Sequence, residues 1–401
     1  MIKEIFELQN PWRLDSGYQF NYENREILDV ILDNLSNNKL IGLVGSRQVG
    51  KSSLLYILIS HLLESGQADS AQIFYFNLDD IMLHELFTNV PNFIQFIGND
   101  RQKKYVFIDE IQRLENPGIS LKEIYDLKLN LKIFYSGSSQ LEVKSKLKEH
   151  LVGRARQFEI QRLNFNEYVH FRKPITKNQA LADILIYGSY PEMAEMKTDM
   201  EKKLLLKDIY QSYVQKDVAD FLKVDNITAF NKLLVLLANQ IGSLLKIDNM
   251  ANSIQISRAT IGKYLSVLEN TFIIKRIYPF YKNYKKEITK SPKIYFLDLG
   301  LRNFILNNFN PLELRDDVGK LFENFYLINR LAEDHYSMNK INYWRTTNQT
   351  EIDFVVEGGN FLEAIEVKWE KKKALPKAFQ TFCAYYPDSS AKVFSREDFL
   401  S

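Results

Sequence analysis

The sequence has little of what secreted, zinc-binding or membrane proteins need. Its one cysteine, Cys383, excludes a disulfide within the chain, and the neighbours Phe382 and Ala384 favour a core position for it. Cysteines and histidines do not cluster as a zinc site requires. The longest apolar run, residues 233–238, is far shorter than the roughly 20 residues of a membrane span. No apolar signal segment follows the first residues. These absences predict a cytoplasmic protein without a membrane partner.

The overall composition is that of an ordinary globular protein. Hydrophobic residues make up 45% and charged residues 25% of the 401 residues, which is enough chain for several domains. No internal repeat and no low-complexity tract is present. The net charge of +2 indicates no partner by itself, so the local distribution of charge has to be considered instead.

A phosphate-binding loop is the clearest motif in the chain. An apolar strand, residues 40–44, precedes the pattern Gly-x-x-x-x-Gly-Lys-Ser, and a helix with apolar periodicity, residues 52–64, follows it. The glycines let successive N–H groups face a β-phosphate, Lys51 reaches the outer phosphates, and Ser52 offers a hydroxyl to Mg²⁺. The N-terminus of the helix adds positive potential. The predicted ATP-binding residues are Gly45, Ser46, Arg47, Gln48, Val49, Gly50, Lys51, Ser52 and Ser53.

Two acids follow a second apolar strand, residues 105–108. They are Asp109 and Glu110, and in a parallel sheet they would emerge at the carboxyl edge, where ligands bind. We expect Asp109 to hold Mg²⁺ through water and Glu110 to polarise the attacking water. A pair of capping carboxylates on a surface turn is the alternative interpretation.

Residues 71–80 and 131–140 predict two further strands. The second ends in three hydroxyls, Ser136, Ser138 and Ser139, one of which could sense the γ-phosphate. We favour Ser138, and a helix cap is the alternative role for any of these serines.

The order of a phosphate loop, an apolar strand ending in Asp-Glu, and the strand "YSGSS" resembles the core of AAA-type (AAA+) ATPases. Residues 151–168 resemble the box in which these ATPases present an arginine to a neighbour's nucleotide. The resemblance implies that Arg154, with Arg156 in reserve, acts in a homo-oligomer, and a structural salt bridge is the alternative. Residues 187–193 and 213–218 are similar to the lid segments of a bacterial and archaeal branch that carries a C-terminal domain of unknown function.

The middle of the chain predicts a winged helix-turn-helix. Residues 228–245 form an amphipathic pattern, a short helix with Asp248 as its cap follows, and Ser257 caps a third. Residues 244–294 hold ten Lys or Arg against three acids, which is typical of contact with nucleic-acid phosphates. A packing module without DNA contact is the alternative. The exposed recognition face would carry Arg258, Thr260, Lys263 and Tyr264, and residues 281–286 would belong to the wing.

The tail carries a pattern of acids and a lysine. Glu323 lies on a predicted helix, residues 319–334, and Asp353 lies on a strand that a Gly-Gly turn joins to another. Glu366 and Lys368 share one face of that next strand because they are two residues apart. Two carboxylates can hold Mg²⁺ or Mn²⁺, and a lysine can stabilise the attacking hydroxide or the pentavalent phosphate.

This pattern resembles the PD-(D/E)XK nucleases, although Glu351 and Ile352, rather than a proline, precede Asp353. The resemblance implies that Glu323 is the helical acid of that family. The catalytic set would then be Glu323, Asp353, Glu366 and Lys368, with Asp353 and Glu366 as metal ligands. A nuclease-like fold that only binds nucleic acid is the alternative.

The sequence thus predicts an α/β protein of four parts. They are an AAA-type P-loop ATPase core with a parallel sheet (1–165), a helical lid (166–226), a winged helix (227–300) and a restriction-endonuclease-like α/β domain (301–401). The predicted function is a Mg²⁺-dependent ATPase switch coupled to a nucleic-acid-binding, nuclease-type tail. Two other functions stay open: a signalling or defence switch with an inactive tail that binds protein or DNA, and a DNA-binding regulator or transposition-type helper.

Overall fold

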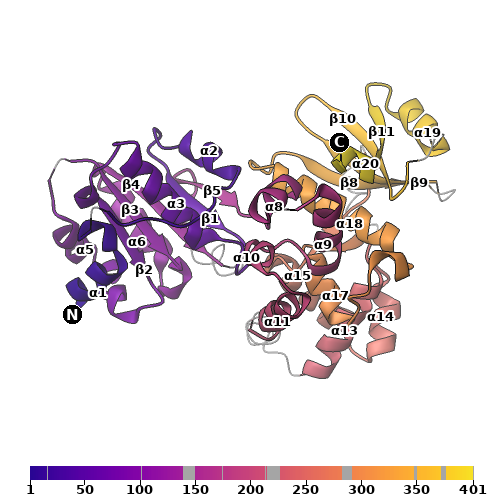
Figure 1. Ribbon diagram of the computed structural model, residues 1–401, viewed down its shortest axis with the longest axis horizontal. Coiled ribbons are helices and arrows are strands. Elements are labelled where there is room, and N and C mark those ends of the chain that lie inside the picture. The colour runs from indigo at the N-terminus through magenta and orange to yellow at the C-terminus, as the bar shows by residue number, and fades with distance from the viewer. Residues whose placement is uncertain are drawn as a thin grey trace. The chain divides into compact units, whose positions relative to one another are not determined.

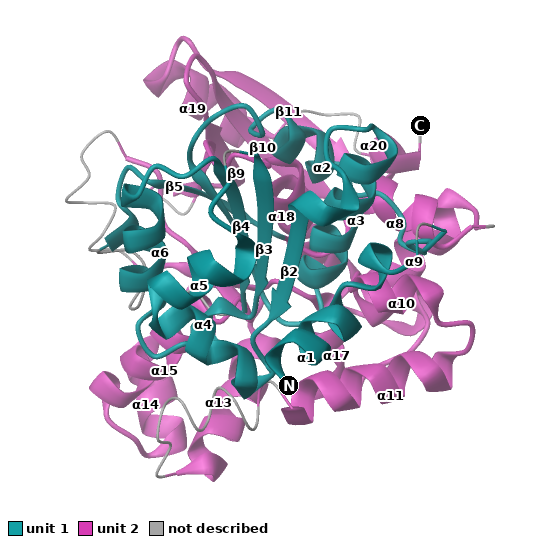
Figure 2. Ribbon diagram, turned by 90° about the vertical axis from the view of Figure 1, so that its left-hand side faces the viewer, with its two compact units in different colours: residues 1–160 teal, residues 161–401 magenta. Residues whose placement is uncertain are grey.

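The computed structural model describes two compact units, Met1–Ile160 and Gln161–Ser401 (Figures 1 and 2). Outside the described residues lie Ser16, Arg101, 139–149, Pro174, Tyr213, 215–225, 282–290, 347–349, 372–375 and Ser401. Ser139 and most of the predicted segments 213–218 and 281–286 therefore lie outside them as well. No helix among the described residues is long and apolar enough to cross a membrane.

The first unit is built on a parallel sheet with the strand order β2-β3-β4-β1-β5. Every residue of β1 and β3 is buried, as the continuous apolar runs require for strands covered on both faces. All four pairings are parallel, so the carboxyl ends of β1, β3 and β4 meet at one edge. The predicted parallel α/β core is confirmed. The strands are β1 (Leu40–Val44), β2 (Ile73–Asn77), β3 (Lys104–Asp109), β4 (Leu131–Gly137) and β5 (Ala155–Glu159).

The helices of the first unit lie beside these strands in both views (Figures 1 and 2). Within the first twenty residues, Trp12 packs on the core, as predicted: it is 3% exposed, and its ring lies edge-on to that of Tyr75 in β2. Asn10 accepts a hydrogen bond from the Tyr75 amide at 2.8 Å. The helices are α1 (Ile2–Gln9), α2 (Ile27–Leu32), α3 (Lys51–Glu64), α4 (His84–Thr88), α5 (Val90–Ile97) and α6 (Pro117–Asp126).

The second unit begins with helices. Those up to residue 305 are α8 (Phe165–Phe171), α9 (Lys177–Tyr187), α10 (Pro191–Glu195), α11 (Asp199–Ile209), α13 (Ile227–Asn239), α14 (Ile247–Ile254), α15 (Arg258–Asn270) and α17 (Leu299–Ile305). Strands β6 (Ile274–Ile277) and β7 (Lys293–Phe296) form an antiparallel pair between α15 and α17. A helix-turn-helix with a wing stays a prediction for this region.

Three local expectations for this region are wrong. The first helix ends at Asn239 rather than at residue 245. Asp248 lies in the first turn of α14 and pairs with Arg258, so it does not cap that helix. Tyr264 is only 5% exposed and lies edge-on to Phe230, because it belongs to the apolar stripe of α15. Ser257 is confirmed as the cap of α15, since it accepts a hydrogen bond from the Thr260 amide at 3.0 Å.

The tail sheet has the strand order β11-β10-β9-β8, and helices α18 (Val318–Glu333), α19 (Lys377–Tyr385) and α20 (Arg396–Leu400) accompany it. Strands β9 and β10 are antiparallel, with Ile365 opposite Phe354. One step further, this register puts Asp353 opposite Glu366, and facing residues of antiparallel strands share a face. The strands are β8 (Lys340–Arg345), β9 (Glu351–Glu357), β10 (Leu362–Lys368) and β11 (Ser390–Ser395).

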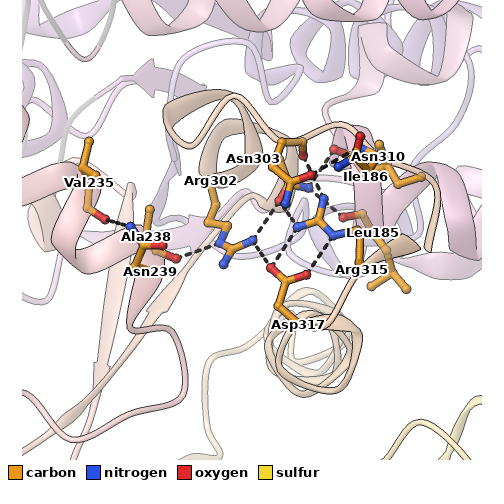
Figure 3. A network of polar contacts seen from close by, with 11 residues as sticks. Leu185, Ile186, Val235, Ala238, Asn239, Arg302, Asn303, Asn310, Arg315 and Asp317 are labelled. Carbon is orange, nitrogen blue, oxygen red and sulfur yellow. Dashed lines mark hydrogen bonds and ion pairs between the residues drawn. The ribbon is translucent and has the colours of Figure 1, made fainter. Parts of the chain in front are cut away.

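A buried polar network fixes the start of α18 (Figure 3). Arg302 and Arg315 both donate to Asp317, at 2.5 and 2.8 Å, and Asp317 directly precedes the helix. Asn303 donates to the carbonyls of Leu185 and Ile186, each at 2.9 Å. Asp317 thus binds two guanidinium groups, and Asn303 connects α17 to α9. These contacts hold the start of α18, the helix that carries Glu323, in place.

Candidate functional site

The phosphate loop has the backbone that its glycines predict. Gly50 has φ +85° and Gln48 has φ +60°, both left-handed, and Gly50 directly precedes α3. A Cβ atom at Gly45 would collide with the carbonyl oxygen of Ile160. The loop therefore needs glycine at its first position for close backbone approach and at Gly50 for a left-handed conformation.

Lys51 is folded onto its own loop. Its ammonium donates to the Ser46 carbonyl at 2.7 Å, and the residue is 5% exposed. Burial lowers the pKa of Lys51 to about 8, while the charges of Glu110 and Asp109 oppose that shift. Arg25 holds the loop from another side by donating to the Val49 carbonyl at 3.0 Å.

Asp109 ends β3 at the same sheet edge as the loop and is 2% exposed. The Tyr75 hydroxyl donates to its Oδ2 at 2.9 Å, and the Ser136 hydroxyl donates to its Oδ1. Two hydroxyls thus orient the carboxylate. Ser52 is half-buried at the start of α3, and no described residue hydrogen-bonds to its hydroxyl. A hydroxyl and a carboxylate are hard oxygen ligands of the kind Mg²⁺ takes, so the residues present fit that ion.

Glu110 has an unusual backbone for its residue type, with φ +56°. Its amide donates to Ser136 Oγ at 3.1 Å, and its carboxylate accepts from Gln112. Gln112 also donates to Ser138 at 2.9 Å. Burial raises the pKa of Glu110, and Lys51 opposes the shift. Ser136 therefore contacts the acid pair directly, whereas Ser138, which we favoured as the sensor, is linked to Glu110 through Gln112.

Arg154 lies at the opposite edge of the sheet. It directly precedes β5, its carbonyl accepts from the Leu40 amide at 2.9 Å, and its guanidinium pairs with Asp126 at 2.9 and 3.1 Å. Because β1 and β5 are parallel, the length of the strand, roughly 16 Å at 3.3 Å per residue, separates Arg154 from the loop edge. Arg154 is therefore too far from the loop of its own chain to touch a phosphate there. Arg156, the reserve, donates to Asn34.

The pKa of Lys51 predicts that ATP affinity depends on pH. A lysine with a lowered pKa is neutral above about pH 8, and binding phosphates requires its charged form, so binding must take up a proton there. We expect the affinity to fall by up to about tenfold from pH 8 to pH 9. Calorimetry in two buffers of different ionisation enthalpy measures the proton uptake. The Lys51→Met variant should bind more weakly and lack this pH dependence, and an equally steep profile in the variant would contradict the assignment.

The structure brings three of the four tail residues into direct contact. The Lys368 ammonium lies 2.6 Å from Glu366 Oε1 and 3.9 Å from Asp353 Oδ2. Asp353 Oδ2 also accepts from the Val367 amide at 2.9 Å. The other oxygen of Glu366, Oε2, is buried, and no described residue hydrogen-bonds to it. An orphan carboxylate oxygen beside a second carboxylate suits a divalent cation.

Glu323 is held by a different set of side chains. Tyr295 of β7 donates to its Oε1 at 2.6 Å, and Lys293 of β7 lies 3.7 Å from the same atom. Lys293 is 2% exposed and also pairs with Glu351 at 2.6 Å. We call Glu323, Glu351, Asp353 and Glu366, together with Lys293 and Lys368, the acid cluster. It has two parts: Lys293 lies beside Glu323 and Glu351, and Lys368 lies beside Asp353 and Glu366. Within the described ranges, no three Asp, Glu, His or Cys side chains stand where they could share one metal ion.

The protonation of the acid cluster reflects its burial. Burial, together with the charges of Glu323 and Glu366, raises the pKa of Asp353 to about 7. Burial also raises the pKa of Glu323, which Lys293 opposes. Burial alone would lower the pKa of Lys368, but the charges of Asp353 and Glu366 outweigh it and raise the pKa. Burial thus favours the protonated forms of Asp353 and Glu323, and a bound cation would oppose this shift by stabilising the carboxylates.

Sequence reasoning missed several of these contacts. In the first unit they are Arg25, Tyr75 and Gln112, and in the second they are Lys293, Tyr295 and Glu351. Glu351 could have been found, because it is two residues from Asp353 on the same strand. Lys293 and Tyr295 likewise share one face of β7.

The chain matches three family models along its length. Residues 37–169 match the model described as an AAA domain. Residues 178–312 and 318–398 match two models, each described as a domain of unknown function, DUF8612 and DUF4143.

The chain is similar to proteins of other organisms over most of their length. Two uncharacterised proteins of Methanocaldococcus jannaschii are 25% and 26% identical to the chain, over 83% and 80% of it and over 75% and 74% of their own lengths. An uncharacterised protein of Haemophilus influenzae is 25% identical, over 81% of each chain.

The solved structures with some similarity to the chain include two nucleotide-bound proteins. The Aeropyrum pernix ORC2 protein with ADPNP and ADP is 12% identical, with 75% of this chain and 97% of that chain covered and a TM-score of 0.44. AMPPCP-bound DnaA from Aquifex aeolicus is 17% identical, with 61% and 86% covered and a TM-score of 0.34. The range that matches the AAA domain model thus contains the phosphate-binding loop, whose backbone is left-handed at Gly50 directly before α3.

Proposed function

We propose that the protein is an ATP-dependent switch that controls access of nucleic acid to a metal-dependent phosphodiesterase site in its tail. The observation that carries the proposal is the contact of one lysine, Lys368, with two carboxylates, Asp353 and Glu366, in a chain that also holds an AAA-type domain. Acids and a lysine on one sheet face suit phosphodiester cleavage, and an ATPase domain supplies the conformational control.

In the first unit, the loop from Gly45 to Ser53 would bind ATP. Lys51 would give up its hydrogen bond to the Ser46 carbonyl and bind the outer phosphates. Their negative charge would stabilise the charged ammonium group. Ser52 and Asp109 would hold Mg²⁺, which neutralises phosphate charge when bound. Glu110 would take a proton from the attacking water, and a serine next to the acids, Ser138 or Ser136, would report the γ-phosphate.

Arg154 would complete the nucleotide site of a second copy. Two observations support action in trans within a homo-oligomer. Arg154 lies at the end of the sheet where the parallel strands begin, and it can exchange its ion pair with Asp126 for a phosphate. The pair is partly exposed, so breaking it costs little.

In the second unit, Asp353 and Glu366 would hold a divalent cation, which supplies a polarised water and a charge clamp when bound. Lys368 would orient the scissile phosphate and stabilise its growing negative charge. Glu323 would support the same site through the electrostatic effect of its negative charge on the other residues of the acid cluster. Exposed Arg258 and Lys263 on α15, with half-exposed Thr260, support nucleic-acid contact by the neighbouring helices.

The test combines metal and nucleotide. Purified protein is incubated with plasmid or single-strand-tailed DNA, in Mg²⁺ or Mn²⁺, with ATP, ADP, a non-hydrolysable ATP analogue or no nucleotide. We expect cutting in one nucleotide state and at least about tenfold slower cutting in another. A tenfold difference corresponds to a coupling free energy of about 1.4 kcal/mol between the nucleotide state and cutting. Equal cutting in every state would remove the switch, and no cutting with either metal would remove the cleavage claim.

A second function has one observation in its favour. Lys293 and Lys368 already neutralise part of the acid cluster, and the described residues offer no ready three-ligand metal site. The tail would then be an inactive platform for protein or DNA in a signalling or defence switch. This function predicts ATP binding without cuts and an Asp353→Asn variant that behaves as the wild type.

A further inference from the structure

The second unit contains a pocket of about 530 Å³ that no motif predicted. Helices α13 and α14, the loop between them and the end of β8 line it. Three of its lining residues are apolar, and the others carry hydrogen-bond donors: Gln240, Ser243, Lys246, Asn249, Ser253 and Arg345. None of the lining residues is an acid, although the chain has almost as many acids as bases. The pocket is therefore suited to an anion.

Several of these donors have no hydrogen-bond partner among the residues that the structure describes. No described residue hydrogen-bonds to the side chains of Gln240, Ser243 or Lys246, and Lys246 is exposed. Lys246 also stands at the N-cap of α14, where no side chain caps the first amides of the helix. A phosphate oxygen would satisfy those amides and would meet the positive end of the helix dipole.

The loop that lines the pocket also lies against the acid cluster. Gly242 and Leu245 donate their amides to the carbonyls of Ile294 and Pro292, at 2.8 and 2.7 Å, on either side of Lys293. A Cβ atom built on Gly242 would lie 3.1 Å from Glu323 Oε1. One stretch of backbone thus borders the pocket on one side and Glu323 on the other.

Arg345 makes a second connection. Its Nη1 lies 3.2 Å from Glu351, which pairs with Lys293. The arginine is held by one carboxylate and is still about a third exposed, so it can also donate to an anion in the pocket.

We propose that this pocket binds a backbone phosphate of the nucleic acid. The neighbouring phosphodiester linkage of the same strand would then lie at the acid cluster. The proposal rests on the proposed nucleic-acid role of the tail and specifies where the strand is held. Lys246 and Arg345 supply charge, and Gln240, Ser243 and Asn249 supply neutral donors. These groups contact the backbone and read no base, so the pocket sets the position of the strand without sequence preference.

The test measures binding without cleavage. Fluorescence anisotropy follows a labelled oligonucleotide bound to the full chain in EDTA over a series of salt concentrations. Lys246→Glu and Gln240→Glu place a carboxylate in the pocket without changing the core, and each is expected to weaken binding about tenfold or more. Lys246→Glu should also lower the slope of log affinity against log salt by about one.

The matched control is Lys207→Glu on α11, an exposed lysine of the same unit outside the pocket. This substitution makes the same change of charge as Lys246→Glu, and the variant should bind the oligonucleotide within a factor of about two of the wild type. Equal losses in Lys207→Glu and Lys246→Glu would overturn the pocket, and so would wild-type binding by both pocket variants. If the wild-type chain binds no oligonucleotide at low salt, the inference falls together with the nucleic-acid role. If binding depends on the pocket but no metal yields cuts, the inference stands and the cleavage proposal falls.

Discussion

A Glu110→Gln variant is expected to bind ATP as the wild type does and to hydrolyse it about 10² to 10⁴ times more slowly, the range for loss of a general base. The substitution keeps the size of the side chain and an oxygen that can accept from Gln112, so the backbone at φ +56° need not change. Only the ability to take a proton is lost. Phosphate release measures hydrolysis, and calorimetry measures ATP binding.

Glu115→Gln is the matched control, because Glu115 is an exposed glutamate of the same segment. Its hydrolysis rate should stay within a factor of about two of the wild type. If Glu110→Gln hydrolyses ATP at the wild-type rate, another group activates water, and Asp109 becomes the next candidate. Because burial raises the pKa of Glu110, wild-type hydrolysis should also slow as the pH falls through that raised value.

The parts of the fold that the sequence predicts best are those whose information is local. The loop, its preceding strand and its following helix are contiguous, so Gly45, Gly50 and Lys51 could be assigned from spacing alone. The acids at the end of β3 follow from one apolar run. On the tail sheet, Asp353 and Glu366 meet because a short turn fixes the register of β9 and β10.

The parts that could not be predicted depend on contacts between distant segments. Arg25 reaches Val49, and Tyr75 reaches Asp109, 34 residues away. Lys293 and Tyr295 enter the acid cluster from a strand pair that the sequence assigns to a wing, and no spacing rule relates β7 to Glu323. The relation of the tail to nucleases and the division into four parts stay predictions.

One misplaced side chain illustrates the limit of helical periodicity. Tyr264 lies at i+3 from Ile261 and i−4 from Leu268, so it belongs to the apolar stripe of α15. An aromatic ring with a hydroxyl suits both a buried and an exposed face, and the sequence alone does not distinguish them. The correction leaves Arg258 and Lys263 as the exposed basic residues of that helix.

The largest effect in the second unit is expected from Asp353→Asn. If the tail cuts nucleic acid, this variant and Glu366→Gln should each lower the cutting rate about 10³-fold or more, because each removes a ligand of the cation that generates the nucleophile. Cutting of labelled DNA in Mn²⁺ measures the loss. Glu363→Gln on the same strand is the control: Glu363 is three residues from Glu366 and projects from the opposite face of β10.

A second measurement on Asp353→Asn separates a lost ligand from a damaged fold. Burial raises the pKa of Asp353 to about 7, so the stability of the acid form is present at low pH and is lost as the pH rises through 7. In chelator, the asparagine variant should therefore melt above the wild type at pH 8, and this gain should shrink toward pH 5. Mn²⁺ should raise the melting temperature of the wild type at pH 8 and not that of the variant. A variant that melts lower at pH 8, or that still gains from Mn²⁺, would contradict the role of Asp353 as a buried cation ligand.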